Sequence, residues 1–332
     1  PAGHGPGAMK ISFIIPLYNC LPLTQTMLAS LRETLPSGLN YEIILVDDGS
    51  TDGTRAWLAG FCQPVVSRSN PLIQSPAPCR AILNEKNLGF AGASNRGAAA
   101  ATGEFLFFLN NDLVLQSHWL EPMLAVFARF ASIGLVGNVQ LNAATGAVDH
   151  TGIFFNHQGK PAHRTDLPRS TRWLGRPVCR RVDALTGACF GIRAAQWRQL
   201  GGFDEGFVNG CEDIDLCLRA TTAGLPHYIA LRSVVRHHIS SSTGRNLRNE
   251  QNTFRLVQRW TERIVFLAAR DWSRHFIEQH WDQSFVYDDI LGREALLCWL
   301  GLLPAAPVRV RTGVRTALGL ELARWRQLLP GH

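Results

Sequence analysis

Short apolar runs alternate with segments of helical periodicity along the N-terminal third of the chain. The runs expected to form strands are Lys10–Pro16, Tyr41–Ser50, Arg80–Asn87 and Glu104–Asp112. Helices are expected at Leu23–Leu35, from a cap at Thr51 or Asp52 to about Phe61, and at Ala91–Gly103. Nearly continuous apolar strands separated by helices indicate a parallel sheet with both faces covered. The predicted fold class is therefore α/β, with a mostly parallel central sheet.

Polar residues end three of these four strands. The clusters are Tyr18-Asn19, Asp47-Asp48 and Asn110-Asn111-Asp112. Turn chemistry alone explains any one of them. Right-handed crossovers, however, place the carboxyl ends of parallel strands along one edge, where open α/β sheets bind ligands. Three polar clusters at one edge therefore favour a binding crevice.

The rest of the chain is expected to be less regular. A helix is expected over His118–Phe130 and a strand over Ile133–Leu141. Gln63–Cys79 has four prolines, which suggests an irregular loop, and Gly146–Arg181 is expected to be a long loop covering the substrate. A further helix should begin near Glu212. We expect one α/β domain at residues 9–248 and a helical, basic C-terminal extension at 249–332.

Composition narrows the class of protein. The 332 residues are 46% hydrophobic and 18% charged, which is typical of a folded globular chain. The net charge of +7 reflects either a solvated surface or attraction to diphosphates or anionic lipid. Nucleic-acid binding is not expected, because the basic residues do not alternate with aromatics in a recognisable module.

Targeting signals and cysteines suggest a cytoplasmic protein. The eight residues before Met9 are expected to be the remnant of an expression tag, and no secretory signal follows them. No apolar stretch reaches the roughly 20 residues needed to cross a bilayer. The eight cysteines are scattered without a CxxC pair, which favours reduced, mostly buried thiols over disulfides or a zinc site.

The acids at the strand ends suggest two kinds of chemistry. Asp47 and Asp48 precede GSTDGT, which is either a turn and a capped helix or a place where a carboxylate accepts hydrogen bonds from a base or ribose. The stretch is neither GxxxxGK[ST] nor GxGxxG, so direct phosphate binding by this loop is not expected. Asp112 suits a hard cation, because Mg²⁺ commonly takes only one or two protein carboxylates.

Two later stretches add candidates. In GCEDIDLCLR, Glu212, Asp213 and Asp215 are either acids placed at a helix start or the source of a general base. Crowding and burial of the three would raise a carboxylate pKa. In VVRHHISSS, strand alternation puts His237 on the inward face, as a core histidine or a metal ligand.

Together these stretches resemble the family 2 glycosyltransferases, which have the GT-A fold. The matching stretches are FIIPLYN, IILVDDGSTDGT, NEKNLGFAGASNRG, FLFFLNNDLVL, LTGACFGIRAAQWRQLGGFDEGF, CEDIDLCLR and VVRHHISSS. They follow the family's order from about Lys10 to Gly244. The C-terminal quarter is not covered by the resemblance.

The resemblance implies roles for particular residues. Asp213 matches the catalytic base, and Asp112 and His237 match the ligands of a divalent cation, Mn²⁺ or Mg²⁺. Expected nucleotide-sugar contacts are Pro16, Asn19, Asp47, Asp48, Asn87, Gly89, Asn95, Asn110, Asn111, Gly187, Ala188 and Glu212. The family's DxD motif has an acid where this chain has Asn110, so we expect the donor diphosphate to complete the metal site.

The implied activity is an inverting, metal-dependent transfer from a UDP- or dTDP-linked sugar. The acceptor expected from the resemblance is a glycan or lipid-linked hydroxyl in cell-surface polysaccharide synthesis, as for rhamnosyltransferases. The alternative is a catalytically impaired relative that binds nucleotide sugars or acts as a scaffold. The C-terminal helix is expected to pack on the catalytic domain, to form a homodimer contact, or to touch the inner membrane face.

Overall fold

The computed structural model describes residues 9–62, 79–168, 177–238, 248–280 and 290–329. It forms two compact units, unit 1 with Pro1–Gly152 and Thr165–Arg245, and unit 2 with Ile153–Arg164 and Asn246–His332. The expected tag remnant and nearly all of the expected loop at 63–79 lie outside the described residues. Among the described helices, none has both the length and the apolar character needed to span a bilayer.

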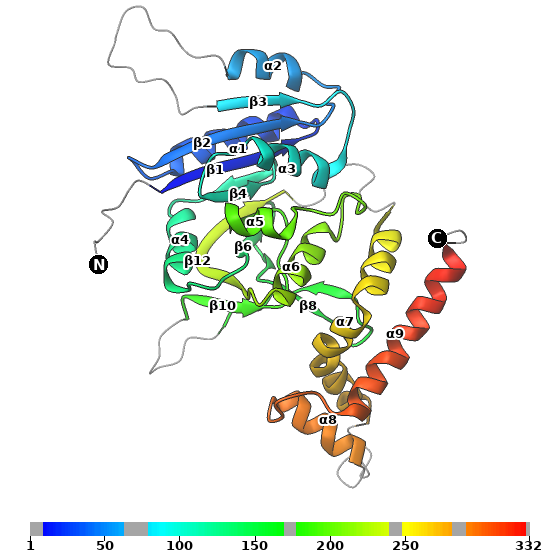
Figure 1. The fold of residues 1–332 in the computed structure, drawn as a ribbon. Helices are drawn as coiled ribbons and strands as arrows, with labels where there is room; N and C mark the ends of the chain where they lie inside the picture. Colours follow the sequence, from blue (N-terminus) through cyan, green and yellow to red (C-terminus); the bar gives the residue numbers. More distant parts are fainter. Residues whose placement is uncertain (1–8, 63–78, 169–176, 239–247, 281–289, 330–332) are drawn as a thin grey trace, which may run out of the picture. The chain divides into compact units, whose positions relative to one another are not determined.

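Unit 1 is built on a mixed, mostly parallel sheet (Figure 1). Its strands are β1 (Lys10–Leu17), β2 (Asn40–Asp47), β3 (Cys79–Leu83), β4 (Phe105–Leu109), β5 (Leu113–Leu115), β6 (Val136–Asn142), β7 (Val148–His150), β10 (Cys179–Val182), β11 (Cys189–Arg193) and β12 (His227–His237). Its helices are α1 (Leu21–Thr34), α2 (Thr54–Phe61), α3 (Gly89–Ala100), α4 (Leu120–Arg129), α5 (Ala194–Leu200) and α6 (Glu212–Thr222).

The order of the strands confirms the predicted fold class. The main path is β10-β12-β6-β11-β4-β1-β2-β3, with β1 parallel to both β2 and β4. Strands β11, β10 and β5 run antiparallel to their neighbours. Strands β1, β2 and β4, whose polar ends were predicted to meet, therefore end at the same edge of the sheet, with β1 between β4 and β2.

Burial of apolar side chains explains why these strands are central. Every residue of β4 is buried, and Phe107 contacts the rings of Phe13 and Trp119. Strands that are apolar on both faces must be covered on both, which is the pattern seen in parallel α/β sheets. Removing such a core aromatic ring typically costs about 3–5 kcal/mol.

Several predicted boundaries were wrong. Helix α2 begins at Thr54 with Gly53 at the N-cap, although Asp52 still accepts a hydrogen bond from the Thr54 N–H at 3.0 Å. The segment 146–181 is not one long loop in its described part: it contains β7, β8 (Ile153–Phe155), β9 (Pro161–His163) and the start of β10. Three-residue strands are too short for periodicity to reveal them.

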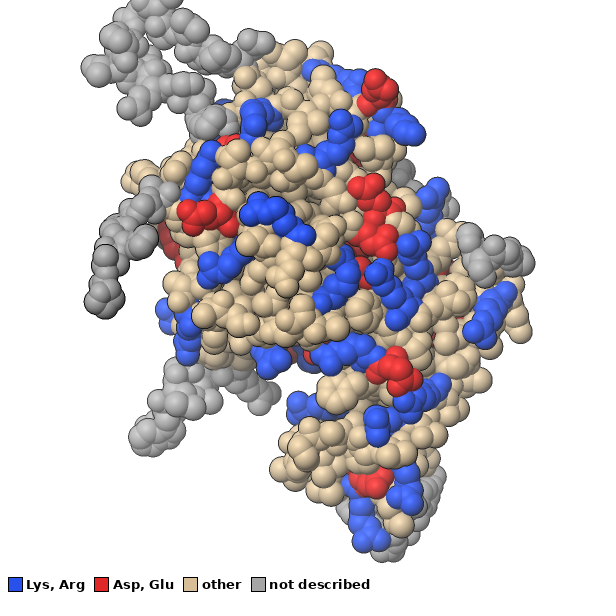
Figure 2. Space-filling model, viewed as in Figure 1, with Lys and Arg blue, Asp and Glu red and all other residues tan. Residues whose placement is uncertain are grey.

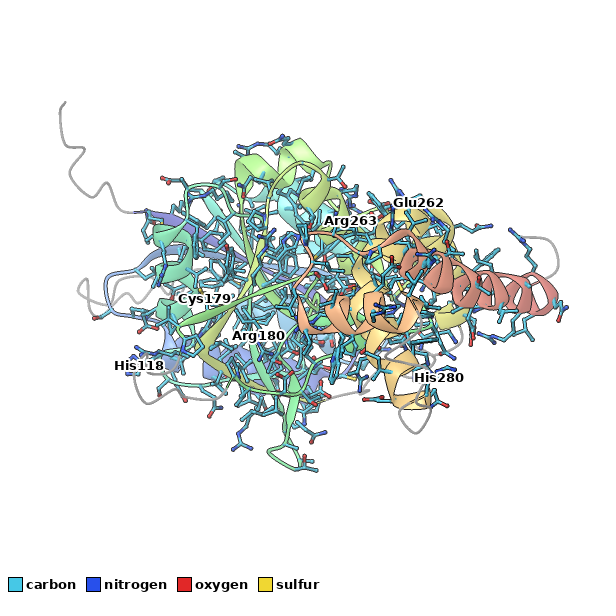
Figure 3. All side chains as sticks on the ribbon, turned by 90° about the horizontal axis from the view of Figure 1, so that it is seen from below. His118, Cys179, Arg180, Glu262, Arg263 and His280 are labelled. Atoms are coloured by element: carbon cyan, nitrogen blue, oxygen red, sulfur yellow. The ribbon has the colours of Figure 1, made fainter. Side chains whose placement is uncertain are left out.

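Unit 2 combines the β8–β9 hairpin with α7 (Asn249–His280), α8 (Ile290–Leu300) and α9 (Val308–Leu328). Helix α7 is kinked at Trp260, whose φ and ψ of −116° and 20° are not helical. Helix α9 buries Val310, Val314, Leu318 and Trp325. An ion pair joins Arg315 of α9 to Glu262 of α7, which is labelled in Figure 3. The apolar side of α9 is therefore used for packing within unit 2.

The structure also shows how the basic side chains are distributed on one face and how far the cysteines are buried. On the face drawn in Figure 2, Lys and Arg side chains lie among neutral and acidic atoms rather than in one continuous stripe.

The prediction that the cysteines are mostly buried was wrong. Cys189, Cys217 and Cys298 are buried, but the other five are partly exposed.

Candidate active site

A cavity lies at the sheet edge where β1, β2 and β4 end. The Asp48 N–H donates to the Leu17 carbonyl at 2.8 Å, so the ends of β1 and β2 are directly joined. The Asn110 N–H donates to the Ala188 carbonyl at 2.8 Å, which joins the end of β4 to the segment before β11. Ligands of open α/β sheets bind where neighbouring crossovers diverge, and this cavity is at such a point.

Eleven of the fifteen residues predicted for the site line this cavity, and four do not. The lining residues are Pro16, Asp48, Asn87, Gly89, Asn110, Asn111, Asp112, Gly187, Ala188, Glu212 and Asp213. Asn19, Asp47, Asn95 and His237 are outside the lining. The structure therefore brings most of the predicted site together from six separate stretches of the chain.

Asp48 holds the start of α3 against the strand ends. It is 3% exposed, and its Oδ1 accepts hydrogen bonds from Asn84 Nδ2 at 2.8 Å and from the Leu88 N–H at 2.9 Å. Its Oδ2 accepts from the Gly89 N–H at 2.9 Å. The carboxylate thus satisfies donors that a helix start leaves without intrahelical partners. Any contact with a nucleotide would use its remaining acceptor capacity.

The neighbouring Asp47 has a different environment. It is fully buried, and its Oδ2 accepts a hydrogen bond from Arg55 Nε at 2.7 Å. Arg55 also donates to the Asn84 carbonyl, so this pair connects α2 with the residue that follows β3. Asp47 therefore supports the cavity wall from behind. Successive side chains of a strand point to opposite faces of the sheet, so Asp47 and Asp48 at the end of β2 lie on different faces.

Asn19 and Asn95 also support the site from outside the cavity. Asn19 has a left-handed backbone with φ of 56°, and its Oδ1 accepts from the Thr51 N–H at 2.8 Å, which fixes the loop after β2. Asn95 bonds both backbone groups of Phe203, donating to the carbonyl at 3.0 Å and accepting from the N–H at 2.9 Å. It thereby fastens α3 to the bend that follows α5.

Asp112 and His237 form a buried pair at the edge of the cavity. Asp112 Oδ1 lies 3.2 Å from His237 Nε2, and the two residues are 7% and 5% exposed. The pairing of β5 with β12 brings Asp112 and His237 together. The His238 N–H also donates a hydrogen bond to the Asp112 carbonyl at 3.0 Å. Of the pair, Asp112 is among the residues that line the cavity and His237 is not.

This pair fits two neighbouring ligands of one divalent cation. With Mg²⁺ at about 2.1 Å from each ligand, adjacent octahedral ligands are separated by about 3 Å. The described part of the chain has no cluster of three or more His, Cys, Asp and Glu residues with metal-binding geometry. Two protein ligands are nevertheless sufficient where water and substrate phosphates complete the shell.

The three acids around the start of α6 have separate surroundings. Asp213 lines the cavity, and its Oδ2 accepts from the Gly187 N–H at 2.6 Å while Oδ1 accepts from the Ile214 N–H at 2.8 Å. Glu212 is buried and accepts from the Gly210 N–H at 2.6 Å. Asp215 is fully buried and paired with Arg219 at 2.8 Å. Asp213 is thus held by a hydrogen bond from Gly187, another residue that lines the cavity.

Sequence reasoning left six lining residues out of the predicted site. They are Leu17, Tyr18, Phe90, Ala93, Thr186 and Asn209. Asn209 is informative, because its backbone has a φ of 56° and its Oδ1 accepts from the Phe90 N–H at 3.0 Å. In the sequence, Asn209-Gly210 just before the acidic helix start is a signal for a tight turn of this kind.

The cavity is lined by carboxylates and amides at the strand ends of an α/β sheet and by the acidic start of α6. Folds of this class bind their ligands at such places. The sequence profile described as glycosyl transferase family 2 matches residues 12–179, which is half of the chain. The chain belongs to this family.

Two curated relatives illustrate the similarity. The O-antigen biosynthesis protein RfbC of Myxococcus xanthus is 28% identical over 244 residues, covering 71% of this chain and 18% of that protein. The pre-mycofactocin glycosyltransferase of Mycobacterium tuberculosis is 28% identical over 335 residues, covering 96% of this chain and 60% of that protein. The chain therefore spans less than two thirds of the length of either relative.

Solved structures share the GT-A fold at low sequence identity. GalNAc-T7, solved with UDP, GalNAc and Mn²⁺, gives a TM-score of 0.60 at 16% identity, covering 98% of this chain and 57% of that one. The mannosyltransferase PcManGT of Pyrobaculum calidifontis, solved with GDP-Man and Mn²⁺, gives 0.55 at 16% identity, covering 98% and 88%. These likenesses confirm the fold.

Proposed function

We propose that this chain transfers a sugar from a nucleotide-diphosphate sugar, UDP- or dTDP-linked, to a hydroxyl of a glycan or lipid-linked acceptor. The observation that carries the proposal is the position of Asp213, which lines the same cavity as Asp48 and Asp112. Support also comes from a relative named for O-antigen biosynthesis and from neighbours solved with UDP or GDP-Man. We place the reaction in cell-surface polysaccharide synthesis, on the cytoplasmic side.

Asp213 is the proposed general base in a single inverting displacement. Its carboxylate, held by the Gly187 N–H, accepts the proton of the acceptor hydroxyl as that oxygen bonds to C1 of the sugar. The bond from C1 to the diphosphate oxygen breaks in the same step, on the opposite face of the sugar. Gly187 leaves little room for a larger residue, because an added Cβ would lie 3.1 Å from the Phe90 ring and 3.4 Å from the Asp213 Cβ.

Asp112 and His237 are the proposed ligands of Mn²⁺ or Mg²⁺, which neutralises charge on the departing diphosphate when bound. Asn110 lines the cavity where the family has a further acid, so one negative charge fewer faces the cation. We therefore propose that the cation binds together with the nucleotide. The Mn²⁺ in two of the structural neighbours supports a divalent cation here.

Binding of a nucleotide sugar without transfer is the second candidate function. The specific observation in its favour is Asn110, because the missing acid weakens the metal site on which transfer depends. Against it, Asp112, Asp213 and His237 are all present, with Asp112 beside His237 and Asp213 bonded to the Gly187 N–H. The two candidates differ in turnover and not in donor binding.

A thermal-shift screen of nucleotide sugars with Mn²⁺ or Mg²⁺ tests the donor half of the proposal. A donor that binds the folded state raises the melting temperature by mass action, and the stabilising compound names the base and the sugar. A metal-dependent rise with one family of nucleotides is expected. A screen in which no nucleoside diphosphate or nucleotide sugar stabilises the chain would contradict both candidate functions.

Contact with a membrane or with a second copy through the C-terminal helices stays a proposal. Helix α9 uses its apolar side within unit 2, but Leu300, Leu302 and Val308 around the α8–α9 turn are 51%, 66% and 66% exposed. Co-sedimentation with anionic vesicles, compared between the natural chain and Leu302→Gln, tests the membrane contact. Equal recovery of the two proteins in the supernatant would argue against it.

A further inference from the structure

Two cysteines meet at the edge of unit 1, away from the proposed active site. Cys62 is the C-cap residue of α2, and Cys79 is the first residue of β3. Their Sγ atoms lie 2.7 Å apart, although seventeen positions separate them in the chain. Figure 1 shows α2 beside β3, the last strand on its side of the sheet.

Regular structure holds both cysteines in place. The Cys62 N–H donates to the Leu58 carbonyl at 3.2 Å, which closes the last turn of α2. Cys79 is paired in register with Ile43 of β2, and both cysteines pack against the hydrophobic core. The fold therefore sets the backbone positions that bring the two sulfurs together.

The surroundings favour reactivity over inert burial. Both cysteines are partly exposed, which distinguishes them from the fully buried Cys189 and Cys217. The hydrogen bond from Cys79 lowers the pKa of the Cys62 thiol, and the Arg32 guanidinium acts in the same direction. The same hydrogen bond, together with burial, raises the pKa of Cys79. Cys62 is thus the thiol that ionises first, and a thiolate is the reactive form.

A zinc site does not explain the pair. Structural zinc takes four Cys, His or carboxylate ligands. The described residues offer no cluster of three such groups, and residues 63–78 contain no Cys, His, Asp or Glu in their sequence. Two thiols in contact, without a third such group beside them in the described part of the chain, fit dithiol chemistry.

We propose that Cys62 and Cys79 form a reactive dithiol that closes into an intramolecular disulfide when a small-molecule disulfide is present. The Cys62 thiolate attacks one sulfur of the reagent, whose S–S bond breaks and releases one thiolate. Cys79 then loses its proton to solvent and attacks the Cys62 sulfur of the mixed disulfide, releasing the second thiolate. The protein loses two electrons and two protons, and the reagent becomes two thiols.

The crosslink would join two elements that support the nucleotide cavity. Helix α2 carries Arg55, which bonds Asp47 and the Asn84 carbonyl, and β3 leads directly to Asn84. A disulfide closing a loop of this length stabilises by constraining the unfolded chain. We expect the oxidised protein to melt roughly 5–10 °C higher than the reduced one.

The test uses the full chain and does not depend on transferase activity. After incubation with oxidised glutathione and blocking of remaining thiols, peptide mass spectrometry should find Cys62 linked to Cys79, with two of the eight thiols lost. Cys179→Ala, which changes another partly exposed cysteine, should leave this crosslink intact. Cys79→Ala should trap glutathione on Cys62. A stable glutathione adduct on Cys62 in the natural chain, or eight thiols that all remain free, would overturn the proposal.

Discussion

Replacing Asp48 by Asn should destabilise the protein even before a nucleotide is added. The carboxylate is buried and accepts hydrogen bonds from Asn84 and from the Leu88 and Gly89 N–H groups. An amide has one acceptor oxygen, so its NH₂ group must face at least one of these donors. A lost hydrogen bond to a charged group costs about 1.5–3 kcal/mol.

The assay is a melting curve of the ligand-free protein, followed by titration with UDP. For a domain of this size the expected loss lowers the melting temperature by roughly 4–10 °C. Asp47→Asn is the matched control, because Asp47 is adjacent and equally buried but bonds Arg55 outside the cavity. The control should lose stability and keep its nucleotide affinity, whereas Asp48→Asn should lose both.

Two results would refute this reasoning. If ligand-free Asp48→Asn melts within about 1 °C of the natural protein, the three hydrogen bonds do not hold α3 in place. If Asp47→Asn weakens UDP binding as much as Asp48→Asn does, the division of the two acids into a supporting and a lining residue is wrong.

Three further predictions concern other parts of unit 1. Asn110→Asp should strengthen Mn²⁺ binding without nucleotide by about tenfold, because it adds a charged ligand; calorimetry showing tight binding to the natural chain would contradict this. Gly187→Ala should lower kcat by roughly tenfold with little change in nucleotide affinity, because the new methyl presses on Phe90 at 3.1 Å beside Asp213, and the wall that holds Asp213 must shift; unchanged kcat would count against this role of Gly187. Burial lowers the pKa of His227 to about 4 from its usual 6.5. The unfolded chain therefore takes up the proton first, and up to about 3 kcal/mol of stability present above pH 6.5 is lost as the pH falls towards 4. Urea midpoints of His227→Gln should depend less on pH over this range than those of the natural protein, and equal slopes would refute the assignment.

Sequence periodicity predicted the sheet because the central strands are apolar on both faces. It also predicted the edge at which Asp48 and Asp112 meet, since parallel strands must end together, whereas Asp213 was assigned to the site by the family resemblance. It did not separate Asp47 from Asp48, because the partners Arg55 and Asn84 are distant in the chain. Long-range partners of this kind leave no local pattern.

The hairpin β8–β9 and the Cys62–Cys79 contact were missed for a related reason. Strands of three residues are too short to show a period of two, and the hairpin belongs to unit 2 although its sequence lies inside unit 1. The cysteines were interpreted by spacing alone, whereas parallel pairing of β3 with β2 brings them together. Tertiary arrangement, and not local sequence, decides both features.

The most direct test of the proposed function is transfer by Asp213→Asn, measured with the donor that the thermal-shift screen identifies. Asp213 accepts from the Gly187 N–H at the cavity wall, and an Asn there retains similar size without a basic carboxylate. Turnover should fall by a factor on the order of 10²–10⁴ while the Kd for the nucleotide stays within about twofold. Substantial turnover by Asp213→Asn would show that another group is the base and would contradict the account of this site.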